Sequence, residues 1–231
     1  MRIAPRRATR LVWGALAAIV VLLILAQLVL PAIAARIARD QIGKYGAVRD
    51  VSVHAFPAIE LLWGHAESAT VRAGDLRLSD TQFDGLVPRM RGIETVDLSA
   101  ESLQLGPLRM RDLRVHKHGE AIEAHATLTQ AELQSALPVG VEVRVLQSTA
   151  AGVQVRVSGS LFGIGASALA LLGAQEGKLV AQPQGFPLAG LARVTIFSDP
   201  RLYVQGFQLA ESAPAGGGEP SYAVTLRATL R

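Results

Sequence analysis

Hydrophobic side chains follow three different patterns along the chain. Residues 11–30 form an apolar run in which Gln27 is the only strongly polar side chain. In residues 32–45 apolar side chains recur at helical spacing and polar ones occupy the rest of the helical wheel, which predicts an amphipathic helix. After residue 50 apolar and polar positions alternate with a period of two, which predicts half-buried strands.

The alternating region predicts a fold that is α+β and mostly β. The predicted strands are residues 51–55, 69–73, 76–83, 96–105, 108–115, 122–128, 139–145, 153–157, 191–197, 202–209 and 222–230. Short connections rich in turn residues join most of them, so neighbouring strands should pair antiparallel. The expected architecture is a long curved antiparallel sheet packed on the N-terminal amphipathic helix and one further helix. If the two helices leave part of the sheet uncovered, an apolar groove remains.

The further helix is predicted at residues 129–137. Thr129 and Glu132 have the spacing of a capping box, and Pro138 cannot continue a helix. Residues 161–172 are apolar and interrupted by glycines, and their period does not choose between strand and helix; we favour a helix after Gly165. Residues 213–220 contain three consecutive glycines and are expected to form a flexible loop.

The apolar run of residues 11–30 is long enough to cross a membrane, because twenty helical residues at about 1.5 Å each span roughly 30 Å. Four arginines precede it and the first acidic residue is Asp40. The positive-inside rule then predicts a cytoplasmic basic tail (1–10), a transmembrane signal-anchor (11–30) and an extracytoplasmic domain (31–231) of a single-pass cell-membrane protein. Cleavage near Ala34 is the alternative, and it would release a secreted or periplasmic domain.

Composition limits the function classes. The chain has 23 basic and 19 acidic residues, but four of the basic ones lie in the N-terminal tail. The remaining domain therefore has no excess positive charge, and we expect no nucleic-acid partner. Cysteine is absent, so neither a disulfide nor a thiolate metal site can form.

The sequence contains no recognisable catalytic motif. It has neither the Gly-x-Ser-x-Gly nucleophile elbow nor a phosphate-binding Gly-x-x-x-x-Gly-Lys loop. His116, His118 and His125 could approach one another on a hairpin and bind a metal, but a solvated hairpin explains them better. We therefore predict a protein that is not an enzyme and carries no metal or other cofactor.

Two groups of residues are candidates for binding. Residues 56–64 concentrate large apolar side chains in a predicted connection: Phe56, Ile59, Leu61, Leu62 and Trp63. They form either a loop packed over the end of the sheet or the entrance of an apolar groove, where Trp63 would suit a water–lipid boundary. Arg109, Arg111 and Arg114 form either a solvated face or a site for a lipid headgroup, since guanidinium groups bind phosphate oxygens well.

The order of these features is similar to a known family. Phe56-Pro57 followed by Leu61-Leu62 and Gly64, and then Leu-Arg-Leu-Ser-Asp at residues 76–80, resembles the LmeA-like family of actinobacterial cell-envelope phospholipid-binding proteins. That family is expected to have glycine before the Phe-Pro pair, where this chain has Ala55. The resemblance implies a fold similar to the tubular lipid-binding class, binding of phospholipids including phosphatidylinositol types, and support of lipoglycan assembly. It brings no catalytic residues.

The leading hypothesis from the sequence is a membrane-tethered, extracytoplasmic protein that holds the acyl chains of an anionic phospholipid in an apolar groove. Its partners would be phospholipid and the membrane, and the sequence identifies no protein partner. The alternative is a non-enzymatic interaction or scaffold protein of the cell envelope, which would dock a partner protein through the apolar loop or a sheet edge.

Overall fold

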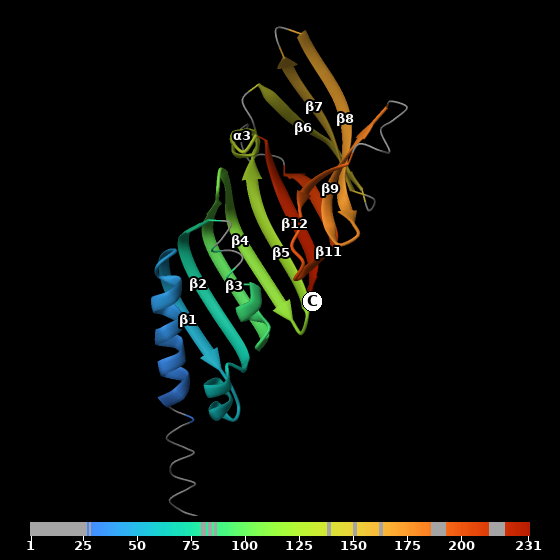
Figure 1. Cartoon of the computed structure of the whole chain (residues 1–231). Helices are drawn as coiled ribbons and strands as arrows, with labels where there is room; N and C mark the ends of the chain where they lie inside the picture. Colours follow the sequence, from blue (N-terminus) through green and yellow to red (C-terminus); the bar gives the residue numbers. More distant parts are fainter. Residues whose placement is uncertain are drawn as a thin grey trace, which may run out of the picture.

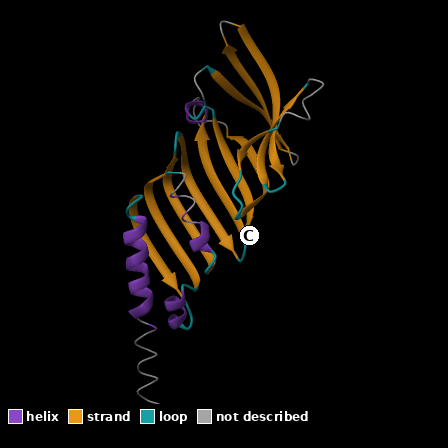
Figure 2. Ribbon diagram, viewed as in Figure 1, coloured by secondary structure: helices purple, strands orange, loops and turns teal. Residues whose placement is uncertain are grey.

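The computed structural model describes residues 27, 29–79, 82, 85, 87–137, 140–149, 152–161, 164–185, 193–212 and 220–231. Figures 1 and 2 show an elongated, mostly β molecule with two sheets and a helix along one edge of the larger sheet. The predicted class, α+β and mostly β, is confirmed. The single long sheet of the prediction is divided into two.

The larger sheet has seven strands in the order β1-β2-β3-β4-β5-β12-β11. Their bounds are β1 Gly46–His54, β2 Ala66–Leu78, β3 Ile93–Leu105, β4 Leu108–His118, β5 Ala121–Thr129, β11 Leu202–Ser212 and β12 Ser221–Leu230. The C-terminal strand β12 lies between β5 and β11, so the last part of the chain completes a sheet begun by the first part.

The smaller sheet has five antiparallel strands in the order β10-β9-β8-β7-β6. They are β6 Val141–Thr149, β7 Gly152–Leu161, β8 Ile164–Gln175, β9 Lys178–Gln184 and β10 Val194–Phe197. In Figure 1 this sheet extends beyond the far end of the larger one, away from the N-terminal helix.

Strand pairing departs from the prediction in the first part of the larger sheet. β2 and β3 are parallel, with Ala66 opposite Ile93, while the other neighbouring pairs in this sheet are antiparallel. The reason is the connection from residue 79 to residue 92, which contains the short helix η2 (Val87–Met90) and returns the chain to the starting end of β2. The predicted strands 69–73 and 76–83 are also not separated by a turn, because β2 runs unbroken from residue 66 to residue 78.

The helix favoured after Gly165 is wrong. Residues 164–175 form β8, which pairs with β7 on one side and β9 on the other. Alanine and leucine are good helix formers, but a central position in the sheet supplies hydrogen bonds along both edges of the strand. Pairing with the neighbouring strands, and not local helix propensity, therefore determines the conformation of residues 164–175.

Both amphipathic helices of the prediction are present. Residues 29–42 form a continuous helix, and α3 (Gln130–Ser135) connects β5 to β6. The capping box of α3 is confirmed: the Thr129 hydroxyl accepts from the Glu132 backbone N–H at 3.2 Å, and the Glu132 carboxylate accepts from the Thr129 N–H at 2.8 Å.

The basic tail of residues 1–10 lies outside the described residues, and so do positions 11–26 and 28 of the predicted anchor and 213–219 of the predicted loop. No helix within the described part of the chain is long and apolar enough to cross a membrane.

The β6–β7 hairpin depends on a glycine. Gly152 has φ +140°, and a Cβ atom there would lie 2.4 Å from the backbone oxygen of Leu172 on β8. We expect Gly152→Ala to lower the free energy of unfolding by about 2 kcal/mol or more, through backbone strain and the displaced strand. Thermal unfolding followed by circular dichroism measures the effect. Gly206→Ala is the matched control, since its Cβ would meet nothing within 4 Å; equal losses in the two variants would contradict the assignment.

Candidate functional site

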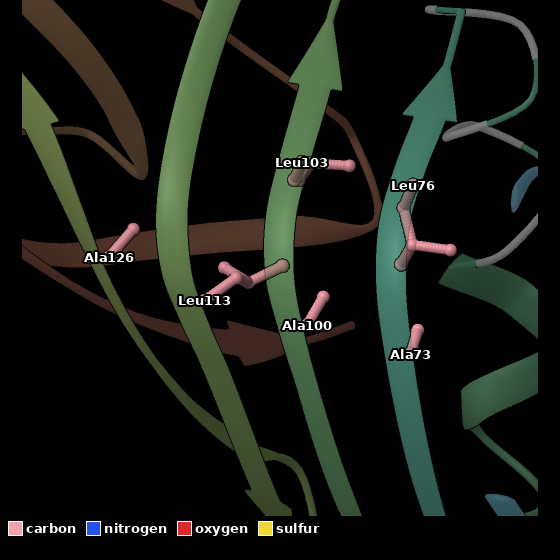
Figure 3. Packing of buried hydrophobic residues seen from close by; sticks show 6 residues of the cluster. All are labelled: Ala73, Leu76, Ala100, Leu103, Leu113 and Ala126. Carbon is pink, nitrogen blue, oxygen red and sulfur yellow. The ribbon is translucent and has the colours of Figure 1, made fainter. Parts of the chain in front are cut away.

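One face of the larger sheet carries a cluster of buried apolar side chains, called here the central cluster. Its members come from four adjacent strands, β2 to β5, and Figure 3 shows them spread across these strands: Ala73, Leu76, Ala100, Leu103, Leu113 and Ala126. A cluster that extends across a sheet needs cover from a second layer to keep water away.

Among the described residues, other elements contribute few apolar side chains to that cover. The partly buried side chains packed against the central cluster are Ile42, Leu78, Leu98, Met110 and Val115. Among the described residues, Ile42 of the N-terminal helix is the only one that does not belong to the sheet itself. Leu98 and Val115, opposite each other on β3 and β4, are only half-buried. The middle of the apolar face, which carries the central cluster and the half-buried Leu98 and Val115, is called here the trough.

Both ends of the same face are covered by other elements. Along β5, Leu128 packs with Val153 and Val155 of β7, which brings the smaller sheet over one end. Near the other end of β5, Ile122 packs against a group of buried side chains that includes Val87 of η2. Phe197 of β10 packs against the same group. Ala126 of the central cluster lies between these two positions. The trough is thus bounded along the strands by two packed regions and at one side by the helix of residues 29–42.

A backbone irregularity in β4 determines which side chains face the trough. The register between β4 and β5 shifts between Arg111 and Arg114, and Asp112 adopts φ +51°. A bulge of this kind bends a strand and changes the face on which later side chains lie. As a result both Met110 and Leu113 contact the central cluster, although they are three residues apart.

Lys117 is a cation on the apolar face. Its side chain is 2% exposed, and its amine donates hydrogen bonds to the backbone oxygens of Ile93 and Glu94. Desolvation by burial lowers the pKa of Lys117, and this effect outweighs the attraction of Glu94 and Glu120. The Lys117 amine therefore binds the first residues of β3, the strand that follows η2.

The predicted entrance residues surround a short helix at the end of the sheet. Residues Ala58–Trp63 form the 3-10 helix η1, which ends at Gly64 with φ +78°. Phe56 is 78% exposed and Trp63 69% exposed, while Leu61 is half-buried. The side chains of Ile59 and Leu62 lie outside the description. Neither Phe56 nor Trp63 belongs to the central cluster, and their role as a groove entrance stays a prediction.

The three arginines lie on the opposite face of β4 from the trough. Arg114 is exposed between buried Leu113 and half-buried Val115, and Arg109 is exposed between two half-buried neighbours. Arg111 forms an ion pair with Glu132 of α3, with Nη2 at 2.8 Å and Nε at 2.9 Å from the carboxylate. These side chains therefore do not line the trough, and any contact with a headgroup would involve lipid outside it.

The Arg111 partner is a buried carboxylate. The Glu132 side chain is 12% exposed. Burial disfavours its charged form, but hydrogen bonds from Thr129 and Arg111 and the nearby guanidinium charge outweigh this, so the pKa of Glu132 falls below its ordinary value of 4.5.

Two cavities open beside α3, of 570 Å³ and 510 Å³. The first is lined by residues of α3 and β6 to β8, the second by residues of α3, β6, β11 and β12; Gln134 and Glu142 line both. Polar and apolar atoms contribute almost equally to their linings, and none of the predicted entrance or headgroup residues contributes to them.

The histidines have separate partners. His116 Nδ1 lies 2.7 Å from the Asp97 carboxylate, His118 Nδ1 lies 3.3 Å from the Thr95 hydroxyl, and His125 Nδ1 lies 3.2 Å from the Thr225 hydroxyl. Within the described ranges, no three His, Cys, Asp or Glu side chains gather in a way that could hold a metal ion.

The trough residues were not singled out from the sequence. Leu98, Leu113 and Val115 occupy alternating apolar positions that predict burial, but only the strand order and the bulge at Asp112 place them together with Ala126 and Ile42. The signal available in the sequence was the run of small and apolar residues on the same face of successive strands.

The chain thus belongs structurally to the mostly β proteins whose main sheet carries one apolar face. Residues 20–228 match the model of the LmeA-like phospholipid-binding family, and the chain therefore belongs to that family. The resemblance noted in the sequence is confirmed over most of the chain. No curated protein and no solved structure matches the chain.

The lowered pKa of Glu132 predicts how stability changes with pH. A carboxylate whose pKa is depressed by folding stabilises the folded state fully above its ordinary pKa, and this stabilisation is lost as the pH falls through the depressed value. Glutamine keeps the capping geometry but not the charge. We expect Glu132→Gln to cost about 1 kcal/mol at neutral pH and nothing in strong acid, measured by urea denaturation across pH. A constant difference at all pH values would show that charge is not responsible.

Proposed function

We propose that this member of the LmeA-like family binds phospholipid by laying acyl chains along the trough. The single observation that supports this is the cover of the central cluster, to which the described chain outside the sheet contributes only Ile42. An apolar surface of this kind is stabilised when a ligand supplies the missing second layer.

Acyl chains are suitable occupants because they are long, flexible and without polar groups. Each buried methylene contributes about 0.8 kcal/mol, so partial coverage of one chain gives measurable affinity without an ionic site. The cation on this face, Lys117, donates to backbone oxygens, so the middle of the trough favours the chains over the headgroup. The headgroup then lies at an open edge.

The proposal includes a location. Residues 11–30 would remain as a signal-anchor, with residues 31–231 outside the cytoplasm, and the bound lipid would serve assembly of cell-envelope lipids or lipoglycans. The apolar run, the preceding arginines and the family support this arrangement. The ligand would be an anionic phospholipid, with phosphatidylinositol types as the first candidates.

One observation favours the alternative, an envelope protein that docks a partner protein. Trp63 is largely exposed, and exposed tryptophan is enriched in protein interfaces. The two functions differ in what contacts Leu98 and Val115, which is lipid in the first and water in the second.

Photocrosslinking of the full-length chain in membranes tests the trough directly. A phospholipid with a photoreactive acyl chain should label peptides of β3 and β4 around Leu98, Leu113 and Val115. In the double variant Leu98→Asn, Val115→Asn we expect about tenfold less labelling, because two apolar contacts of the chain are removed.

Two controls belong to this experiment. Labelling of the peptide that contains residues 11–30 reports contact with bulk lipid and should not change. His116→Gln alters an exposed position on the opposite face of β4 and should also leave labelling intact. If the wild-type chain is labelled only in residues 11–30, acyl chains do not occupy the trough.

A separate prediction concerns Arg109 and Arg114. Arg109 and Arg114 have no ion-pair partner among the described residues, so they are able to attract anionic headgroups. We expect Arg109→Ser, Arg114→Ser to lower the ratio of anionic to zwitterionic lipid labelled anywhere on the chain by about threefold at low salt, as two exposed charges would. Arg156→Ser, an exposed arginine of β7, is the control. An unchanged ratio would remove the arginines from the site.

A further inference from the structure

The structure ties the predicted anchor to the segment that carries Phe56. The Gln27 side-chain amide donates to the backbone oxygen of Ala55 at 3.1 Å, and its oxygen accepts from the N–H of Ala58 at 2.8 Å. Gln27 therefore holds both flanks of Phe56-Pro57. Its amide, the only strongly polar group in the run of residues 11–30, forms hydrogen bonds with the domain through both its nitrogen and its oxygen.

The position of Gln27 defines the height of this segment relative to the membrane. Three residues separate Gln27 from the end of the apolar run, which in a helix is about 5 Å. If residues 11–30 span the bilayer, as the proposed function assumes, the Phe56 segment reaches the boundary between hydrocarbon and headgroups.

The side chains at that height are apolar and exposed. Phe56 and Trp63, 78% and 69% exposed, flank η1, and Val29 and Ile33 of the adjoining helix are each about half exposed. Large exposed apolar side chains are costly in water, and tryptophan is favoured at membrane interfaces, where its ring lies in the apolar layer and its N–H stays hydrated.

We propose that Phe56 and Trp63 insert into the outer leaflet beside the anchor, so that the end of the larger sheet rests on the bilayer and the smaller sheet points away from it. The occupant of this surface is the phospholipid bilayer. The continuity of the surface with the apolar run, through Gln27, carries the argument.

Tryptophan fluorescence tests the insertion in the full-length chain. The protein has two tryptophans, so Trp13→Phe leaves Trp63 as the only one. In vesicles of phosphatidylcholine with brominated acyl chains we expect loss of Trp63 emission, stronger for bromine near the headgroup than near the chain end. Aqueous iodide should quench it little.

A matched control places the fluorophore on the smaller sheet. Ile196 on β10 is 54% exposed. In a chain with Trp13→Phe and Trp63→Phe, Ile196→Trp should be quenched by iodide and not by brominated lipid. The Trp63 measurement is repeated with Leu98→Asn, Val115→Asn; persistent quenching there shows that lipid in the trough is not the quencher.

The outcomes separate this inference from the proposed function. A Trp63 that iodide quenches, in a chain that stays with the vesicles, overturns the insertion and leaves the trough standing. Blue-shifted Trp63 emission without quenching by brominated lipid means that protein covers it, which also overturns the insertion. A chain that leaves the vesicles at alkaline pH overturns the anchor, and the insertion with it. Quenched Trp63 without trough labelling supports the insertion alone.

Discussion

The structure depends on the need to cover one apolar face of a seven-stranded sheet. β12 and β11, from the C-terminal part of the chain, extend the sheet next to β5, and this widens the face that must be kept from water. The chain covers the two ends by different means, with β7 of the smaller sheet at one end and η2 at the other. In the middle, the apolar cover that the described residues provide comes from the sheet's own side chains and from Ile42. The smaller sheet therefore covers one end of the apolar face, and the trough is the part of that face that it does not cover.

In the proposed arrangement, the hydrogen bonds between Gln27 and the Phe56 segment determine how the larger sheet is oriented relative to the membrane. A glutamine within an apolar run is costly unless its amide is bonded, and here backbone groups of the domain satisfy it. The bond pair aligns the helix of residues 29–42, the edge of the larger sheet and η1 at a common end. In the proposed arrangement the trough then lies close to the bilayer from which its lipid comes, so lipid exchange needs no long excursion through water.

Local features of the fold were predictable from the sequence, and long-range ones were not. The capping box at Thr129 and the period-two strands depend on neighbouring residues, and both are confirmed. The parallel pairing of β2 with β3 depends on a connection of fourteen residues whose path no local pattern specifies. β8 is a strand because two neighbours pair with it, in spite of good helix formers. For the proposed site, the entrance role that the sequence suggested for Phe56 and Trp63 stays a prediction, and Leu98 and Val115 were missed because their meeting depends on strand register.

In the proposed function, the two faces of β4 have different roles. One face presents Leu113, Val115 and a buried Lys117 whose amine is occupied by backbone oxygens, so it offers contact with methylene groups and little attraction for phosphate. The other face carries exposed Arg109 and Arg114. Affinity for lipid should therefore come mainly from acyl chains, which differ little between lipid classes, while exposed charge modulates which headgroup is preferred. Under the proposed function, such a protein accepts many phospholipids with a weak preference for anionic ones, so the composition of the adjacent leaflet largely determines what it binds.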